Sequence, residues 1–331
     1  MFSVIIPLYN KEKSCTRAIK SVLQQKYNKL ELIIVNDGST DNSLDYALKA
    51  ANGDGRARVI QQKNQGVSAA RNIGIKAAKN EYIAFLDADD FWHPQYLEII
   101  KNVIEKYPDY LWWGSDYFKG DNTKLERYYK KHTRYILSPN DAVVLDYFKE
   151  SITRLCINMD SVVMKRSTLL RTGGFPEEII SSEDQELFSK FAMISKLPRV
   201  SHKLTYYSAN AENRCCTRVN QQRLDIPLIP FVEENIDYLS SVKWHKDDDM
   251  YWVTEYVYDR FLLYIWRRYR MGYLSWFSFM KEITKCRKTR ESRFFLLFAV
   301  LFSLIPRRFY TILGKAWPRN LPHFMTVRTD N

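Results

Sequence analysis

The chain has 331 residues, of which 46% are hydrophobic, and its formal net charge at pH 7 is +12. This length and apolar content suffice for a large buried core, and they exclude a chain that is disordered throughout. The positive charge is concentrated towards the C-terminus, because residues 243–331 hold 17 Lys plus Arg against 8 Asp plus Glu. A basic region of this kind indicates an anionic partner, either a phospholipid surface or a nucleic acid.

Short apolar runs alternate with helical patterns through the first third of the chain. Each intervening stretch has apolar or small residues at helical spacing. The expected strands cover residues 2–7, 30–37, 58–62 and 82–87, and the expected helices cover 12–26, 42–51, 67–79 and 94–106. This alternation predicts an α/β fold with a doubly wound, mostly parallel sheet.

The middle of the chain has a mixed pattern. Strands are expected over 110–118 and 156–165, and a helix is expected over 183–194. Trp112 and Trp113 are adjacent in the first of these strands, and strand neighbours point to opposite faces of a sheet. One of the two is therefore expected to face the core, and the other is a candidate contact for an acceptor.

The chain changes character after about Thr217, where helical patterns rich in Tyr, Trp, Leu and Arg begin. We therefore divide it into an α/β domain over 1–215 and a basic, helical region over 216–331. Within that region the apolar run 294–305 is bracketed by basic residues and is too short to cross a bilayer. Two interpretations stay open, a helix packed in the core and an interfacial membrane anchor over 287–313.

The cysteines and the N-terminal residues indicate a reducing compartment. The five cysteines are odd in number and include no C-x-x-C pair, which argues against a disulfide framework and against a zinc ribbon. The first residues, MFSVIIPLYN, lack the basic start and the long apolar segment of a signal peptide. We expect a cytoplasmic protein that is peripheral on the inner face of the plasma membrane.

Polar clusters follow three of the expected strands, at the ends that a parallel sheet brings to one edge. The first strand ends in PLYN (7–10), the second in NDGSTD (36–41) and the fourth in DADD (87–90). An Asp-x-Asp pair at such an edge offers the hard oxygen ligands that suit Mg²⁺ or Mn²⁺. Taken alone, each cluster could equally be capping and turn chemistry or a solvated loop.

The ordered set of these segments resembles the family 2 glycosyltransferases, which are inverting enzymes with the Rossmann-like GT-A fold. The matching segments are SVIIPLYN, LELIIVNDGSTDNS, NQGVSAARNIGIKAAKNEYIAFLDADD and GGFPEEIISSEDQELF. They cover roughly residues 1–210, so the last third of the chain lies outside the resemblance. The resemblance implies that the first domain is a GT-A catalytic domain.

The resemblance also assigns roles in nucleotide binding. Pro7, Tyr9 and Glu12 match the stretch that meets the base and ribose, and Asp37 matches the carboxylate that reads the uracil edge. Gly66 belongs to the matched segment that closes over the nucleotide. These assignments imply a UDP-sugar donor.

Arg71 matches the same closing segment, and the Asp-x-Asp motif is implied to bind the metal and the donor. Asp89 is the implied direct ligand of a divalent cation, Mn²⁺ or Mg²⁺. Asp87 is implied to lie towards the ribose or a metal-bound water, and Ala88 between them lines the same donor site. Asp90 is expected to cap or pack.

The implied general base is Asp184, at the start of the expected helix 183–194. Glu183 beside it and Gly174, in the glycine turn just upstream, are implied to line the donor sugar. Without the resemblance, the two carboxylates are interpreted as first-turn acids that the helix dipole favours. Asn158 and Asp160 are further candidates for a contact with the donor or acceptor sugar.

The sequence thus predicts a metal-dependent inverting glycosyltransferase. Its donor is expected to be a UDP-hexose or a UDP-N-acetylhexosamine, and its acceptor a glycan or lipid-linked glycan in surface polysaccharide synthesis. The alternatives are a catalytically inactive homologue that binds sugar nucleotides, or a basic nucleic-acid-binding protein. We favour a membrane surface over nucleic acid as the anionic partner, because the basic tail is also hydrophobic. A nucleotidylyltransferase is disfavoured, because the PLYNKEKS segment after the first strand has no glycine for a phosphate loop.

Overall fold

The computed structural model describes most of the first two thirds of the chain and short pieces beyond. The described residues are 1–132, 141–153, 155–179, 181–212, 231–235, 250–257, 260, 261, 264, 278 and 281. The chain forms two compact units, one of Met1–Asp146 with Cys156–Gln221 and one of Tyr147–Leu155 with Gln222–Asn331. All strands of the central sheet belong to the first unit.

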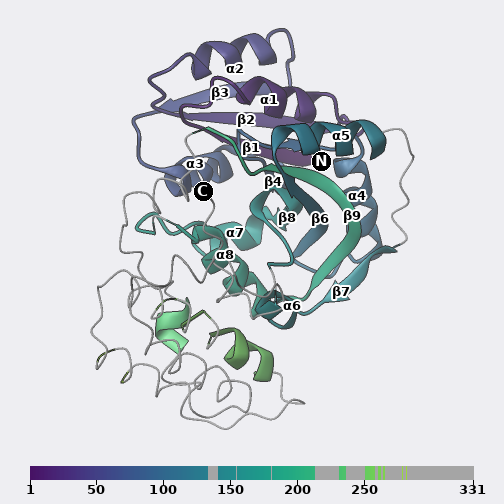
Figure 1. The fold of residues 1–331 in the computed structure, drawn as a ribbon, viewed down its shortest axis with the longest axis vertical. Coiled ribbons are helices and arrows are strands. Elements are labelled where there is room, and N and C mark those ends of the chain that lie inside the picture. Colours follow the sequence, from purple (N-terminus) through teal and green to yellow (C-terminus); the bar gives the residue numbers. More distant parts are fainter. Residues whose placement is uncertain are drawn as a thin grey trace, which may run out of the picture. The chain divides into compact units, whose positions relative to one another are not determined.

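Nine strands form one sheet in the described part of the first unit (Figure 1). They follow the order β3-β2-β1-β4-β8-β6-β9-β5, and β7 pairs with β9. Their bounds are β1 (Phe2–Leu8), β2 (Leu30–Asp37), β3 (Ala57–Gln62), β4 (Tyr82–Phe85), β5 (Phe91–Trp92), β6 (Trp112–Gly120), β7 (Val143–Leu145), β8 (Val162–Lys165) and β9 (Leu197–Ser208).

The strand directions bring several strand ends to one edge of the sheet. β1 to β4 run parallel, and β8 is antiparallel to both β4 and β6. β4 and β6 therefore point the same way, and β9 is parallel to β6. The C-terminal ends of β1, β2, β4, β6 and β9 share one edge, which we call the carboxyl edge. Ligands of open α/β sheets bind at such an edge.

Helices cover both faces of the N-terminal half of the sheet. On one face, Phe2, Val4 and Ile6 of β1 share a core with buried side chains of two helices, α1 and α4. On the other face, an added Cβ at Gly74 of α3 would collide with the side chain of Ile5. The small residues of α3 thus allow it to lie close against β1. The helices of the first unit are α1 (Cys15–Leu23), α2 (Ser43–Ala51), α3 (Val67–Ala77), α4 (Tyr96–Lys106), α5 (Asn122–His132), α7 (Arg166–Arg171) and α8 (Glu183–Ala192).

The predicted α/β fold is confirmed, and the expected elements of the first third agree with the structure to within a few residues. Several elements of the first unit were not expected, namely β5, α5, β7, α7 and the long β9, which curves along the sheet (Figure 1). The run 156–165 is a strand only from Val162, because a short 3₁₀ helix, η2 (Met159–Ser161), precedes it.

Both tryptophans of β6 are buried, so the expected contact between one of them and an acceptor is wrong. Trp112 packs against Phe188 and Phe191 of α8, with ring centroids 6.0 and 5.8 Å apart. Trp113 packs edge-on against Tyr82 of β4 at 5.6 Å. Their opposite orientations follow from strand alternation, but side chains cover the sheet on both faces at this point.

The second unit includes α6 (Tyr147–Thr153) and helical residues at 231–235 and 251–257. Phe148 of α6 stacks on Phe231, with centroids 5.7 Å apart. The expected membrane anchor over 287–313 lies outside the described residues. Among the residues that are described, no helix has both the length and the apolar character needed to traverse a bilayer.

Candidate active site

The Asp-x-Asp pair lies at the carboxyl edge, directly after β4. The amide of Leu86 donates to the carbonyl of Ile5 at 3.0 Å. A hydrogen bond to β1 therefore fixes the main chain immediately before the Asp-x-Asp pair. Ala88 is buried, whereas the side chain of Asp87 is 31% exposed. The segment is thus held at the end of a central strand with a carboxylate open to the edge.

Arg71 is a buried cation that joins this segment to helix α8. Its side chain is 3% exposed, its Nη2 donates to Asp87 Oδ1 at 2.8 Å, and its Nη1 donates to Glu183 Oε1 at 2.7 Å. The guanidinium also lies over the ring of Phe175, 5.1 Å from its centroid. Burial disfavours the charged guanidinium, but the two carboxylates outweigh burial and raise the pKa of Arg71. One residue of α3 therefore fixes β4 and α8 against each other.

A second protein cation holds the other carboxylate of the pair. Lys11, in the loop between β1 and α1, donates from Nζ to Asp89 Oδ2 at 2.8 Å. Burial raises the pKa of Asp89, and Lys11 opposes that shift. Each carboxylate of the Asp-x-Asp pair thus has a positive partner supplied by a different element.

Asp90 and Asp160 form a buried carboxyl pair next to the Asp-x-Asp segment. Both are 1% exposed, and carboxylate oxygens of the two residues lie within 4.8 Å of each other. Asp160 Oδ1 accepts a hydrogen bond from the amide of Asp87, and Asp90 Oδ1 accepts one from the amide of Ser208, each at 2.7 Å. Burial, and then repulsion by Asp160, raises the pKa of Asp90. Asp160 in this way positions the main chain of Asp87.

Asp37, at the end of β2, holds the turn that precedes α3. It is 3% exposed, and its Oδ1 accepts hydrogen bonds from Gln62 Nε2 and from the amide of Gln65, each at 2.8 Å. Its Oδ2 accepts one from the amide of Gly66 at 2.9 Å, and Gly66 has a positive φ of 93°. The structure thus gives Asp37 a role in shaping the loop, and its contact with uracil stays a prediction.

The loop after β1 packs on the loop after β2. Glu12 Oε2 accepts hydrogen bonds from the amide and the side-chain Nδ2 of Asn42, at 3.2 and 3.1 Å. Pro7 is buried in β1 and needs no N–H there, because the β1–β4 ladder ends at Ile5. Tyr9 follows at the carboxyl edge, half-buried. Glu12 therefore has a structural role in joining two loops, beside the role in donor binding that the sequence predicts.

Asp184 lies in the first turn of α8, beside the Glu183 that Arg71 holds. Its Oδ1 accepts a hydrogen bond from the amide of Gln185 at 2.8 Å. Ser182, just before the helix, has a φ of 73°, in the left-handed region that residues other than glycine rarely adopt. Burial, and then repulsion by Glu183, raises the pKa of Asp184 to about 7, while Arg71 opposes the shift. A carboxyl group with this pKa can take up and release a proton near neutral pH.

The comparison with known families agrees with this arrangement of residues. Residues 3–160 match the family described as glycosyl transferase family 2. This matched part of the chain, residues 3–160, belongs to glycosyl transferase family 2. An uncharacterized glycosyltransferase of Rickettsia felis is 33% identical over 203 residues, which are 61% of this chain and 32% of that protein. The chain spans about a third of the length of this protein and of two other curated Rickettsia relatives.

Solved structures show that this family 2 chain shares the GT-A fold. TarS of S. aureus in complex with UDP-GlcNAc has a TM-score of 0.57 at 17% identity, covering 86% of this chain and 79% of that chain. Mannosyltransferase PcManGT from Pyrobaculum calidifontis, in complex with GDP-Man and Mn²⁺, has a TM-score of 0.56 at 16% identity. That match covers 94% of this chain and 83% of the mannosyltransferase.

The Asp-x-Asp segment of this family 2 chain has a donor set that fits a divalent cation. Carboxylate oxygens are the hard ligands that Mg²⁺ and Mn²⁺ prefer. Ligand oxygens of Asp87, Asp90 and Asp160 lie within 4.8 Å of one another, but the buried pair is already bonded to main-chain amides. The ammonium of Lys11 balances the negative charge of Asp89 in this structure. The Asp89 carboxylate therefore already holds one cation, and a metal ion could take the place of that ammonium. Asp89 and Asp87 therefore remain the fitting pair.

The glycine turn of the family, before α8, is anchored by Asn72 of α3. Asn72 Nδ2 donates to the carbonyl of Phe175 and to Glu177 Oε1, each at 2.9 Å, and its Oδ1 accepts from the amide of Phe175 at 2.8 Å. Gly174 has a φ of 70°, and an added Cβ there would lie 2.5 Å from Asn72 Oδ1. The close approach of Asn72 thus requires glycine at this position.

Gly174→Ala is expected to lower the free energy of unfolding by about 1–3 kcal/mol, because it adds backbone strain and displaces Asn72. Gly173→Ala is the matched control, since Gly173 also has a positive φ of 82° but has nothing within 4 Å of an added Cβ. Urea unfolding of both variants measures the difference. Equal losses in the two variants would contradict the role of Asn72.

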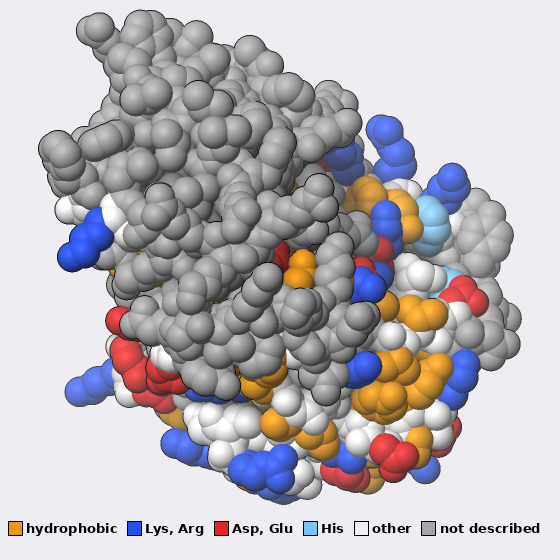
Figure 2. All heavy atoms as spheres, turned by 90° about the horizontal axis from the view of Figure 1, so that it is seen from below, with side chains coloured by type: hydrophobic (Ala, Val, Ile, Leu, Met, Phe, Trp, Pro, Cys, Tyr) orange, Lys and Arg blue, Asp and Glu red, His pale blue; other side chains and the backbone are white. Residues whose placement is uncertain are grey.

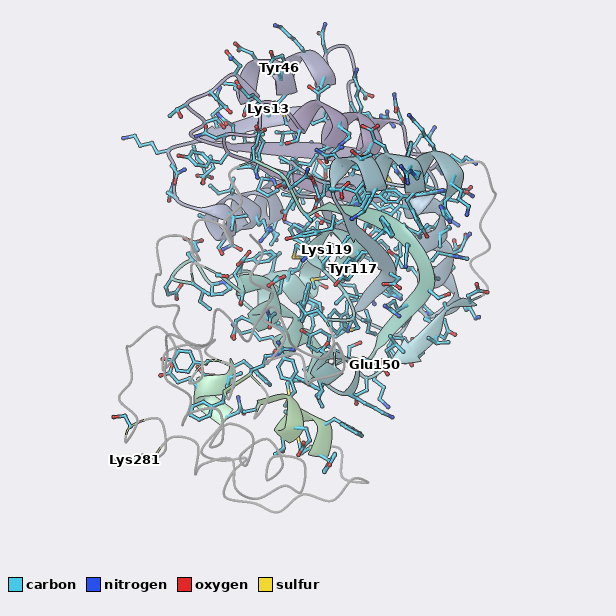
Figure 3. The ribbon with its side chains drawn as sticks, in the orientation of Figure 1. Lys13, Tyr46, Tyr117, Lys119, Glu150 and Lys281 are labelled. Carbon is cyan, nitrogen blue, oxygen red and sulfur yellow. The ribbon has the colours of Figure 1, made fainter. Side chains whose placement is uncertain are left out.

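The aromatic pair at the end of β9 has one buried and one half-buried member. Tyr206 is buried and stacks on Phe91, with centroids 4.9 Å apart. Tyr207 lies under the ammonium of Lys119, 5.4 Å from the ring centroid. Figure 3 shows Lys119 beside Tyr117 on the same strand, β6. Tyr206 is thus part of the core, whereas Tyr207 is half-buried at the end of β9.

Three residues position parts of the site, but nothing in the sequence indicated that role. Lys11, Asn72 and Asp160 act on residues 78, 103 and 73 positions away, respectively. Asp160 was a candidate for sugar binding, but its placement beside Asp87 follows from the antiparallel pairing of β4 with β8. That pairing interrupts the parallel order and is not visible in the hydrophobic pattern.

Proposed function

We propose that this chain is an inverting, metal-dependent glycosyltransferase. It transfers a sugar from a nucleotide diphosphate donor to a hydroxyl group of a glycan or lipid-linked glycan. The observation that carries the proposal is the double ion pair of Arg71, because it sets the helix that bears Asp184 against the Asp-x-Asp segment. A candidate base and a candidate diphosphate site are thereby next to each other, as sugar transfer requires.

The proposed donor is a UDP-hexose or a UDP-N-acetylhexosamine. The solved relatives support a nucleotide diphosphate sugar, since TarS is in complex with UDP-GlcNAc and PcManGT with GDP-Man. Among these, the sequence resemblance favours uridine, through the match of Asp37 to the residue that reads uracil. The proposed roles of Pro7, Tyr9, Glu12 and Gly66 in holding the nucleotide depend on the same resemblance.

Asp184 has the proposed role of general base. It accepts the proton of the acceptor hydroxyl as that oxygen attacks the anomeric carbon on the side opposite the leaving diphosphate, which inverts the anomeric centre. Glu183 and Gly174 line the donor sugar, and Arg71 orients Glu183. Asp89 and Asp87 would hold a divalent cation, which would supply positive charge to the departing diphosphate.

A panel of nucleotide sugars tests the proposal. The purified chain is incubated with UDP-, GDP- and CMP-sugars and a mixture of free and lipid-linked glycan acceptors, with Mn²⁺ or with chelator, and the release of the free nucleotide is measured. We expect release from UDP-sugars that requires the metal, because the departing diphosphate needs a counter-charge. Donor binding by calorimetry without any turnover would favour the inactive homologue, and the absence of both would overturn the proposal.

The anionic partner of the C-terminal region is proposed to be a membrane surface. On the face in Figure 2, the described Lys and Arg side chains are scattered among acidic, polar and hydrophobic ones. The proposal instead depends on the basic, apolar sequence of 287–313, which suits an interfacial segment at the inner membrane face near a lipid-linked acceptor. We expect co-sedimentation with anionic vesicles that weakens when 287–331 is deleted. Equal binding by the shortened chain would contradict the proposal.

A further inference from the structure

We infer that Lys11 competes with the divalent cation for Asp89, and that displacement of Lys11 by the metal releases the segment that follows β9. The inference rests on the proposed function, because it concerns the same metal site. It assigns Lys11 the role of a built-in counter-ion for the donor site before the metal binds. It also couples metal binding to the chain over residues 209–212.

The first observation is the position of the ammonium group. Lys11 Nζ lies 2.8 Å from Asp89 Oδ2, and both side chains are 13% exposed. Water therefore screens this pair little, and the ammonium compensates a carboxylate that is largely removed from solvent. Without a positive partner, Asp89 would be an unpaired carboxylate close to Asp87, which adds repulsion.

The second observation is that the same ammonium holds a distant part of the chain. Lys11 Nζ donates to the carbonyl of Glu212 at 2.6 Å. The amide of Lys13 donates to Glu212 Oε1 at 2.9 Å, so two contacts fix Glu212 to the loop between β1 and α1. Lys11 therefore joins the Asp-x-Asp motif directly to the segment after β9, and the Lys13 amide is a second contact that does not involve Asp89.

The two cations of the site differ in how easily a metal can replace them. Arg71 is 3% exposed and is bonded to Asp87 and Glu183 through two different nitrogens, so its position is fixed on two sides. Lys11 carries a single charged group on a flexible stem in a loop. A divalent cation that bound Asp89 would repel the ammonium at close range. The ammonium then leaves Asp89, and its bond to the carbonyl of Glu212 is lost with it.

Lys13 provides a matched control within the same loop. Its side chain is 80% exposed, and its Nζ lies 3.9 Å from Glu212 Oε2 (Figure 3 labels Lys13). Lys13→Met removes the same charge from the same loop as Lys11→Met. It leaves the contact between Lys11 and Asp89 intact, so it separates a general effect of loop charge from displacement at Asp89.

The test measures binding of Mn²⁺ alone, without nucleotide, from the electron paramagnetic resonance signal of the free ion. Lys11→Met is expected to bind Mn²⁺ more tightly than the wild type by a factor between about 5 and 150, because no ammonium has to be displaced. Lys13→Met should retain the wild-type affinity. Equal or weaker binding by Lys11→Met, while the wild type binds Mn²⁺, would overturn the inference.

Hydrogen exchange of a peptide covering 209–212 gives a second, independent measurement. Addition of Mn²⁺ should accelerate exchange in the wild type, whereas Lys11→Met should exchange rapidly with and without the metal. Unchanged exchange in the wild type at saturating Mn²⁺ would also overturn the inference. If the proposed function itself is wrong, the wild-type chain should bind neither Mn²⁺ nor the donor, and this outcome differs from the two above.

Discussion

Asp184→Asn is expected to lower turnover by about 10²–10⁴-fold while donor binding is retained. The substitution keeps the size and the hydrogen-bonding oxygen of the side chain but removes the group that accepts the proton. Nucleotide release measures turnover, and calorimetry with the donor measures binding. Asp45→Asn in the first turn of α2 is the control, since it makes the same charge change at an exposed helix start. Unchanged turnover in Asp184→Asn would exclude this residue as the base.

The pH dependence of the same reaction gives a signature of Asp184. Because burial raises its pKa to about 7, the fraction of ionised Asp184 increases as the pH rises through that value. Turnover limited by the base should therefore increase with pH below about 7 and level off above it. A rate that is constant from pH 5 to 8 would contradict this assignment.

The raised pKa of Asp184 also makes the stability of the folded chain depend on pH. The ionised form is disfavoured in the folded chain, so the wild type loses stability as the pH rises from about 4, the ordinary value, to about 7. Asp184→Asn removes this cost. The variant should therefore unfold at a higher temperature than the wild type at pH 8 and at a similar temperature at pH 4, although it is inactive.

Arg71→Met is expected to lower the free energy of unfolding by about 3–5 kcal/mol, because it leaves the carboxylates of Asp87 and Glu183 without their buried partner. Urea unfolding measures this loss of stability. Because Asp87 and Glu183 are expected to move when their common partner is removed, donor binding should also weaken. Arg58→Met is the control. Arg58 makes a single ion pair, to Glu31 at 3.1 Å, and its side chain is 37% exposed.

The control is expected to lose about 1 kcal/mol or less, because water screens an exposed pair. The contrast between the two variants is the informative result. Similar, small losses in both would show that Arg71 does not hold β4 against α8 and would remove the main support for the proposed function.

Much of the fold could be predicted from the sequence, because the first four strands are apolar runs separated by helical patterns. Continuous apolar runs are typical of parallel strands that are buried on both faces of a sheet. The structure confirms that the four strands are parallel and that β1, β2 and β4 are buried in this way. The long β9 was missed because the polar residues Arg199, His202 and Lys203 interrupt its apolar pattern, although Val200 and Leu204 are buried. The sequence has no local sign that such a strand joins β6.

The site residues were predictable to the extent that they lie at strand ends or at a helix start. Asp87, Asp89 and Asp184 were named from the sequence, and the structure connects their segments through Arg71. The long-range partners could not be predicted in the same way. The contact from Lys11 to Asp89 depends on how two loops fold over one edge, and no local periodicity encodes that.

The hydrogen bonds from Asp87 to Asp160 and from Ser208 to Asp90 have a consequence for engineering. They tie the Asp-x-Asp segment to η2 and β9, which come from a later part of the chain than the loops that follow β1 and β2. A chimera that grafts only the first hundred residues onto another enzyme of this fold would therefore separate the motif from its support. A transplant that keeps the motif supported has to include the η2 turn and β9.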